Sequence, residues 1–156
     1  MTNTIAKMFA IAAVLFSTSS IVNAQEVSEE LKKALSFRPR QSNVDYDKPT
    51  NEELPNCRIE SSLDKFKMKG YVVYDPAGRI LRQFFDVDRN GKIDQWSFFK
   101  NNIEVYRDLD TNADRKTDQY RWMGTAGIRW GLDSDQNGKI DSWKMISAEE
   151  LSLIHI

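Results

Sequence analysis

The most informative part of the sequence is an acidic stretch in the middle of the chain, Asp86-Val87-Asp88-Arg89-Asn90-Gly91-Lys92-Ile93-Asp94. The same pattern returns without gaps at residues 110–118 and again at residues 133–141. The first aspartates of the three copies are 24 and 23 residues apart. Because a fixed period indicates an array of one supersecondary unit, the chain is predicted to repeat one structural element three times.

Each copy carries oxygen-bearing side chains at positions 1, 3, 5 and 9, and a lysine at position 7 that offers its backbone carbonyl. Calcium binds about six to eight such oxygens, so each copy is a candidate calcium loop. Ordinary Asx turns use the same residue types and are the alternative. An aspartate at position 9 in all three copies favours calcium. The predicted ligands are Asp86, Asp88, Asn90, Lys92 and Asp94; Asp110, Asn112, Asp114, Lys116 and Asp118; and Asp133, Asp135, Asn137, Lys139 and Asp141.

Position 6 of such a loop requires unusual backbone angles, which favour glycine. Gly91 and Gly138 meet this requirement, whereas the second copy has Arg115. We therefore expect the second loop to be strained, rearranged or weaker in binding.

The motif resembles the calcium loops of EF-hand, thrombospondin type 3 and dockerin proteins. It departs from the EF-hand at position 12, where a bidentate glutamate is replaced by Ser97, Arg121 or Lys144. It also lacks a helix on each side, and the cysteines of the thrombospondin repeats are missing. Without the bidentate ligand, we expect dissociation constants on the order of 10⁻⁴–10⁻³ M.

Strict alternation after each acidic stretch predicts half-buried strands of an antiparallel sheet. One face carries an aspartate followed by large apolar residues, and the other face is polar. The predicted apolar face is formed by Asp94, Trp96 and Phe98; Asp118, Tyr120 and Trp122; and Asp141, Trp143 and Met145. The predicted polar face carries Gln95, Ser97, Gln119, Arg121, Ser142 and Lys144.

Return strands precede the acidic stretches, with Leu81 and Phe85, Val105 and Leu109, and Ile128, Trp130 and Leu132 at matching offsets. Hairpin turns are predicted at residues 75–78, 100–102 and 124–127. The fold class is therefore mainly β: an antiparallel up-and-down meander of repeated hairpins, with acidic calcium-type loops on one edge and short N-terminal helices. The alternating aromatic residues are expected in the core, whereas Tyr106 and Phe84 are expected on the opposite face, available for surface contacts.

Residues 25–56 are predicted to form short helices and a linker. Val27, Leu31 and Leu35 recur every four residues, which indicates an amphipathic helix over 28–36 with Ser28 as its N-cap. Residues 41–49 are polar and are interpreted as an irregular linker. Thr50 and Glu53 fit a capping box for a helix of about one turn, limited by Pro55. Cys57 follows, as a buried residue or, alternatively, as a free or intermolecular thiol. The helix near 28–36, curling of the sheet or further chain could cover the apolar sheet face.

The two ends of the chain have special compositions. Residues 1–24 have a positive start, a short apolar run and Val22-Asn23-Ala24 before Gln25, which is typical of a secretory signal peptide. The apolar run is too short to span a bilayer, so no stable membrane insertion is expected after cleavage. Residues 151–156, Leu-Ser-Leu-Ile-His-Ile, resemble a translated sequencing adapter, and we expect an artefactual tail. The meander with its three repeats is assigned to residues 57–150.

Composition excludes several function classes. The chain has 22 basic and 23 acidic residues, so its net charge of −1 gives no reason to expect nucleic-acid binding. Its single cysteine excludes an intrachain disulfide, and its single histidine, His155, excludes zinc sites built on several His or Cys and Ser-His-Asp triads. No catalytic residues are predicted, because every conspicuous aspartate pair belongs to an acidic loop.

Four further stretches carry a family resemblance: residues 44–47 (VDYD), 104–108 (EVYRD), 118–122 (DQYRW) and 146–150 (ISAEE). They are similar to a group of uncharacterised secreted proteins of planctomycete-type bacteria, over roughly residues 35–150. The resemblance implies export, the calcium repeat and a longer full-length protein, but no activity. We expect a secreted or periplasmic calcium-binding module with a structural or interaction role and an envelope protein or glycan as partner. The alternatives are a carbohydrate- or peptide-binding module that uses exposed aromatics, and the non-catalytic N-terminal part of a larger secreted enzyme.

Overall fold

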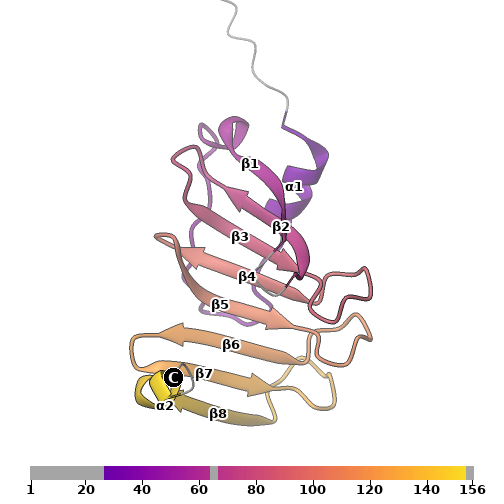
Figure 1. Cartoon of the computed structure of the whole chain (residues 1–156), viewed down its shortest axis with the longest axis vertical. Helices are drawn as coiled ribbons and strands as arrows, with labels where there is room; N and C mark the ends of the chain where they lie inside the picture. The colour runs from indigo at the N-terminus through magenta and orange to yellow at the C-terminus, as the bar shows by residue number, and fades with distance from the viewer. Residues whose placement is uncertain (1–26, 64–66, 154–156) are drawn as a thin grey trace, which may run out of the picture.

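Short turns between alternating segments produce a single antiparallel sheet. The computed structural model describes residues 27–63 and 67–153, and its eight strands pair in the order in which they follow along the chain (Figure 1). The predicted up-and-down meander is therefore confirmed. The strands are β1 (Arg58–Leu63), β2 (Lys69–Tyr74), β3 (Ile80–Phe85), β4 (Gln95–Lys100), β5 (Ile103–Leu109), β6 (Gln119–Gly124), β7 (Gly127–Leu132) and β8 (Ser142–Ser147).

Local turn chemistry explains the hairpins that face away from the acidic stretches. Between β2 and β3, the carboxylate of Asp75 accepts hydrogen bonds from the backbone N–H and Nε of Arg79, at 2.8 and 2.6 Å. Between β4 and β5, Asn101 and Asn102 take φ of 49° and 66°, as two-residue hairpin turns require. The predicted turns at 75–78, 100–102 and 124–127 each join two paired strands.

The three acidic connections follow β3, β5 and β7 and project from the same end of the sheet (Figure 1). Backbone hydrogen bonds link successive connections: the N–H of Asp110 donates to the carbonyl of Asp94 at 2.8 Å, and that of Asp133 to the carbonyl of Asp118 at 2.9 Å. The end of each acidic stretch is thus joined to the start of the next.

The helix predicted over 28–36 forms as α1 (Glu29–Ser36), and Ser28 caps it by accepting a hydrogen bond from the N–H of Leu31 at 3.2 Å. Its apolar side, which includes Leu35, is buried in one core cluster with Val73 and Phe84 of the sheet. Helix α1 therefore covers the sheet face formed by the first strands.

The predicted capping box also forms. The backbone N–H of Thr50 donates to Glu53 at 2.8 Å, and the N–H of Glu53 donates back to Thr50 Oγ1 at 3.2 Å. A single 3-10 turn, η1 (Leu54–Asn56), follows and contains the helix-limiting Pro55. Cys57 is buried, as predicted, and burial raises the pKa of its thiol. A buried, protonated thiol is a packing residue rather than a reactive one.

The linker closes the core beyond α1. Residues 37–48, here called the strap, follow α1 and contain no helix or strand. They lie behind the sheet in Figure 1. Val44 and Tyr46 of the strap pack against a core cluster that contains Phe98 and Tyr106, and the Tyr46 ring meets the Phe98 ring edge-on at 5.3 Å. Helix and strap together therefore cover the aromatic face of strands β2 to β6.

A buried arginine fixes the strap to the sheet. Arg82 of β3 has no solvent exposure, and its guanidinium lies 4.4 Å from the ring centre of Tyr46 and 5.1 Å from that of Phe98. It also donates a hydrogen bond to the backbone carbonyl of Asp47 at 2.9 Å. Burial lowers the pKa of Arg82 to about 10, so the side chain stays charged at neutral pH. The strap thus supplies the Tyr46 ring and the Asp47 carbonyl, and β4 supplies the Phe98 ring, to a cation that is fully removed from solvent.

Two surface assignments from the sequence were wrong. Tyr106 is 0% exposed and Phe84 is 5% exposed, although both were expected on the outer face. The cause is the strand register, which pairs Tyr106 with Phe98 and Phe84 with Trp96. Directly paired residues of an antiparallel sheet point to the same face, so both rings belong to the core under the strap.

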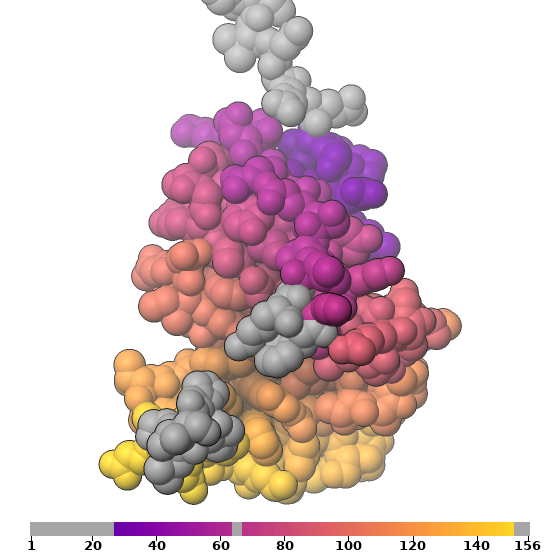
Figure 2. All heavy atoms as spheres, viewed as in Figure 1, coloured from indigo at the N-terminus to yellow at the C-terminus, as the bar shows by residue number. Residues whose placement is uncertain are grey.

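The second face of the sheet is less polar than its alternation suggested. Gln95 and Ser97 were expected on an open polar face but are 7% and 0% exposed. Phe85 and Leu109 of the return strands pair with Gln95 and bring apolar side chains onto that face. Figure 2 looks onto this face of the sheet. The indigo atoms of α1 are visible only at the upper right, because α1 packs against the opposite face. The central strands are therefore buried on both sides.

Burial decreases toward the last strand, contrary to expectation. Trp143 and Met145 were predicted in the core but are 49% and 61% exposed. At this end the strap bonds through Gln41, whose backbone N–H donates to the Tyr106 hydroxyl and whose side chain donates to the carbonyl of Gly138. Helix α2 (Ala148–Leu153) contacts β7 and β8 without burying these two side chains. Because neither the strap nor α2 covers them, they face solvent.

The signal peptide predicted over residues 1–24 lies outside the described residues. Residues 151–153 of the predicted tail continue α2, and the remaining three residues of the tail are also outside the described part. Among the helices described, none has the length and apolar character needed to cross a bilayer.

We predict that the strap is a major source of stability. The substitution Tyr46→Ala removes a ring that contacts both Phe98 and Arg82 and should lower the free energy of unfolding by about 3 kcal/mol. Asp45→Ala is the matched control: it removes only a solvent-exposed ion pair with Lys100 and should change stability by less than about 1 kcal/mol. Urea denaturation measures both. Equal effects of the two substitutions would show that the strap adds little to the core.

Candidate metal centres

The three acidic loops share one hydrogen-bonding pattern, beginning with the aspartate at position 1. In each loop this carboxylate accepts a hydrogen bond from the backbone N–H at position 6. The three bonds are Gly91 to Asp86 at 2.9 Å, Arg115 to Asp110 at 2.7 Å and Gly138 to Asp133 at 2.8 Å. The repeat seen in the sequence is therefore a repeat of structure.

Position 9 closes each loop by the same device. Its carboxylate accepts a hydrogen bond from the backbone N–H at position 2, seven residues earlier. The shortest of these bonds run from Val87 to Asp94 at 2.9 Å, Thr111 to Asp118 at 3.1 Å and Ser134 to Asp141 at 2.7 Å. In every loop, the carboxylates at positions 1 and 9 therefore hold the two ends of the loop together through hydrogen bonds from backbone N–H groups.

The backbone requires left-handed angles at two positions in each loop. At position 6, φ is 85° for Gly91, 75° for Arg115 and 86° for Gly138, so the predicted strain falls on Arg115. Position 4 also has positive φ, at Arg89, Ala113 and Gln136. Sequence reasoning missed position 4, because none of these three residue types signals a left-handed conformation.

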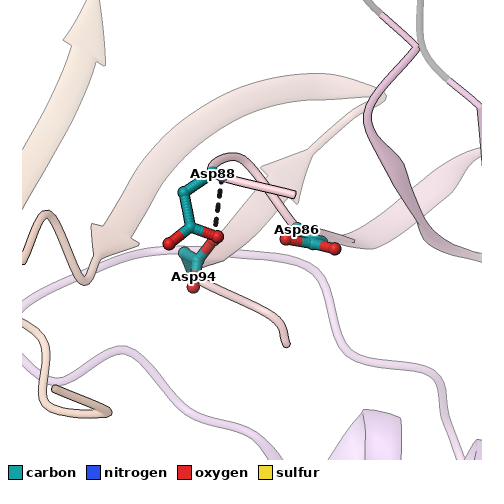
Figure 3. Close-up of side chains that lie close together, drawn as sticks. All are labelled: Asp86, Asp88 and Asp94. Atoms are coloured by element: carbon teal, nitrogen blue, oxygen red, sulfur yellow. Dashed lines mark hydrogen bonds between the residues drawn. The ribbon is translucent and has the colours of Figure 1, made fainter. Parts of the chain in front are cut away.

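The first loop assembles a cluster of three carboxylates. Asp86, Asp88 and Asp94 each offer an oxygen, and these oxygens lie within 4.8 Å of one another. Figure 3 shows Asp88 and Asp94 close together, with a hydrogen bond of 3.2 Å from the Asp88 N–H to Asp94 Oδ2, and Asp86 beside them. Three hard anionic oxygens at this spacing could hold a metal ion.

One oxygen of the first cluster lacks a partner. Asp86 is 7% exposed, and its Oδ1 is buried without any hydrogen bond, while Oδ2 accepts from Gly91. Leaving a buried carboxylate oxygen unsatisfied is unfavourable unless a cation compensates it. Burial raises the pKa of Asp94, and the neighbouring Asp88 and Asp86 add to this effect against backbone hydrogen bonds that lower it. The first loop thus concentrates negative charge that a bound cation would neutralise.

The third loop forms a similar but more open cluster. The carboxylates of Asp133, Asp135 and Asp141 lie within 4.8 Å of one another, but only Asp133 is buried. Both oxygens of Asp133 already accept hydrogen bonds, from Asn137, Gly138 and the Tyr120 hydroxyl. The cluster of the third loop could also hold a metal ion, but its buried carboxylate has no unsatisfied oxygen for the ion to compensate.

Within the described part of the chain, the second loop forms no group of three carboxylates, and its position 3 is Asn112 rather than an aspartate. The backbone N–H and the hydroxyl of Thr111 each donate a hydrogen bond that is shared between the two carboxylate oxygens of Asp118, at 2.9 to 3.3 Å. Both oxygens of Asp110 are also used, by backbone N–H groups that include Arg115. Arg115 signalled a weaker loop in the sequence, but the hydroxyl of Thr111 is the direct competitor for the carboxylate.

Several predicted side-chain ligands at positions 3 and 5 accept hydrogen bonds from the loop backbone in this structure. Asn90 Oδ1 accepts from the N–H of Lys92 at 2.9 Å, and Asn137 Oδ1 accepts from that of Lys139 at 2.8 Å. In the second loop, Asn112 accepts from Asp114, and Asp114 accepts from Lys116. Participation of the asparagines and of the lysine carbonyls in ion binding therefore stays a prediction. The position-12 residues do not replace the bidentate glutamate of an EF-hand, because Arg121 and Lys144 are cationic and Ser97 offers a single hydroxyl oxygen.

Comparison with known proteins adds no assignment: no protein-family model, no curated protein and no solved structure matches this chain. The resemblance to planctomycete-type secreted proteins stays a prediction. The functional assignment therefore rests on loop geometry.

We predict that Arg115→Gly raises the free energy of unfolding by about 1 kcal/mol, because glycine adopts a φ of 75° without the side-chain penalty. The converse substitution, Gly91→Ala, should lower it by a similar amount. An added Cβ at Gly91 meets nothing within 4 Å, so this control isolates the backbone effect. Chemical denaturation measures both. If Gly91→Ala stabilised the chain as Arg115→Gly does, a requirement for left-handed backbone angles at position 6 would be contradicted.

Proposed function

We propose that this chain is an exported calcium-binding β-repeat module with a structural or interaction role. The observation that carries the proposal is the first acidic cluster, where a buried carboxylate oxygen of Asp86 has no hydrogen-bond partner. A calcium ion between Asp86, Asp88 and Asp94 would satisfy that oxygen and offset two of the three adjacent negative charges.

The chemistry of the cluster favours calcium over softer metals. All three side chains are carboxylates, and hard oxygen ligands suit calcium and magnesium, whereas zinc and copper prefer histidine and cysteine. The chain has one cysteine and one histidine in total, and neither belongs to an acidic loop. Calcium tolerates irregular geometry better than magnesium, which suits a short loop with main-chain and amide oxygens.

A bound ion would act as a clamp between strands. Asp86 directly follows β3, and Asp94 directly precedes β4, with its N–H bonded to the carbonyl of Phe85 at 3.0 Å. An ion between them would hold the ends of two central strands together. At a free concentration ten times the dissociation constant, one site adds about 1.4 kcal/mol to stability. That amount is a substantial part of the margin of a small domain that lacks disulfides.

Export fits weak sites of this kind, because calcium is abundant outside cells and scarce in cytosol. The expected dissociation constants, on the order of 10⁻⁴–10⁻³ M, would be useful only in such a compartment. We therefore propose a secreted or periplasmic location and an envelope protein or glycan as partner. The conspicuous carboxylates are assigned to metal loops, so no catalytic role is proposed for them.

A carbohydrate- or peptide-binding module is the second candidate. The residues first proposed for it, Tyr106 and Phe84, are buried, but Trp143 and Phe37 are exposed. Tyr71 of β2 is exposed as well, so these three side chains offer aromatic surface to a ligand.

We predict that calcium raises the melting temperature of the chain and that a chelator reverses the increase. Asp86→Asn should abolish most of the calcium-dependent shift, because it removes the charge of the buried ligand. Asp110→Asn is the matched control at the same position of the second loop and should retain most of the shift, since that loop forms no group of three carboxylates. Differential scanning calorimetry at several calcium concentrations measures the effect. A melting temperature independent of calcium would refute the proposal.

A further inference from the structure

A cavity of about 450 Å³ lies between the strap and the second acidic loop. Arg38 and Arg40 of the strap and Arg115 of the loop line it. The aromatic side chains of Phe37 and Trp96 line the same cavity, with their ring centres 6.5 Å apart. The volume falls in the range of small-molecule sites, and the lining combines charged and aromatic groups.

The cavity has an excess of positive charge. Its single acidic lining residue is Asp108, against three arginines. The Asp108 carboxylate is already engaged, because it accepts hydrogen bonds from the Tyr106 hydroxyl at 2.6 Å and from the backbone N–H of Arg40 at 3.1 Å. Within residues 27–63 and 67–153, the guanidinium groups of Arg40 and Arg115 have no hydrogen bond or ion pair. The two guanidinium groups can therefore bond an external anion, although the nearby Asp108 carboxylate offsets part of the charge of Arg40.

Arg115 reaches the cavity from a position that otherwise requires glycine. The corresponding residues of the first and third loops are Gly91 and Gly138, with nearly the same φ. A non-glycine residue in this conformation costs about 1 kcal/mol. Strained residues of this kind cluster at functional sites, where the side chain serves a purpose other than folding. In this loop the strain places a guanidinium beside the two arginines of the strap.

We propose that this cavity binds a sugar that carries an oxyanion, either a carboxylate or a sulfate. The planar guanidinium fork of arginine bonds such groups in pairs, which lysine does not. Phe37 is accessible, and Trp96 is half-buried, so both offer apolar surface to the body of the ligand. The site lies apart from the carboxylates of the first and third loops, and its function does not depend on calcium binding.

The test compares three sugars that differ only at carbon 6: D-galacturonate, D-galactose 6-sulfate and D-galactose. Each is titrated into the full chain at constant calcium, and binding is followed by tryptophan fluorescence and calorimetry. We expect at least one of the two anionic sugars to bind at least ten-fold more tightly than galactose. The stronger of the two identifies the anion. Failure of both to bind, or equal binding of galactose, would overturn the proposal.

Arg115→Gly provides a sharp variant, because it restores the glycine of the other loops and should not impair folding. We expect it to weaken anionic-sugar binding at least ten-fold, and Arg40→Gln to do the same. Lys69→Ala is the matched control: it removes a positive charge from an exposed position of β2 that does not line the cavity, and it should leave the affinity unchanged. Undiminished binding by both arginine variants, or an equal loss in the control, would overturn the assignment.

Discussion

The acidic loops depend on one interaction: the carboxylate at position 1 accepts a hydrogen bond from the backbone N–H at position 6. This bond folds the chain back on itself and forces left-handed angles at positions 4 and 6 of each loop. It also turns the aspartate inward, next to the carboxylate at position 9. In the first loop this arrangement leaves a buried oxygen of Asp86 unsatisfied, and the need for a cation follows from that oxygen.

The sheet cannot stand alone, because its aromatic face must be covered. Helix α1 covers the first strands and the strap continues to β6, fixed by Arg82 between the rings of Tyr46 and Phe98. The same strap brings Arg38 and Arg40 to the second loop. One irregular segment thus closes the core and lines the cavity beside the second loop. Beyond its reach Trp143 is exposed, so the core ends where the strap ends.

Patterns within a few residues were predictable from the sequence. The Ser28 cap, the Thr50–Glu53 capping box, the hairpin turns and the repeated loops all depend on local chemistry. The sequence did not predict which face each side chain of the return strands occupies, because the strand register decides whether Tyr106 lies on the same face as Phe98. The packing of the strap on the sheet could not be predicted either, since the contact between Tyr46 and Phe98 joins distant parts of the chain. In the second loop Arg115 signalled weakness, but the competing hydroxyl of Thr111 became evident only in three dimensions.

The most direct test is to locate the ions. A crystal grown in millimolar calcium would be measured for anomalous scattering and compared with one grown in chelator. The account predicts a strong anomalous peak in the first loop, within coordination distance of oxygens of Asp86, Asp88 and Asp94, that disappears with chelator. A first loop without such a peak, with Asp86 Oδ1 satisfied by water or by a repacked N–H, would contradict it.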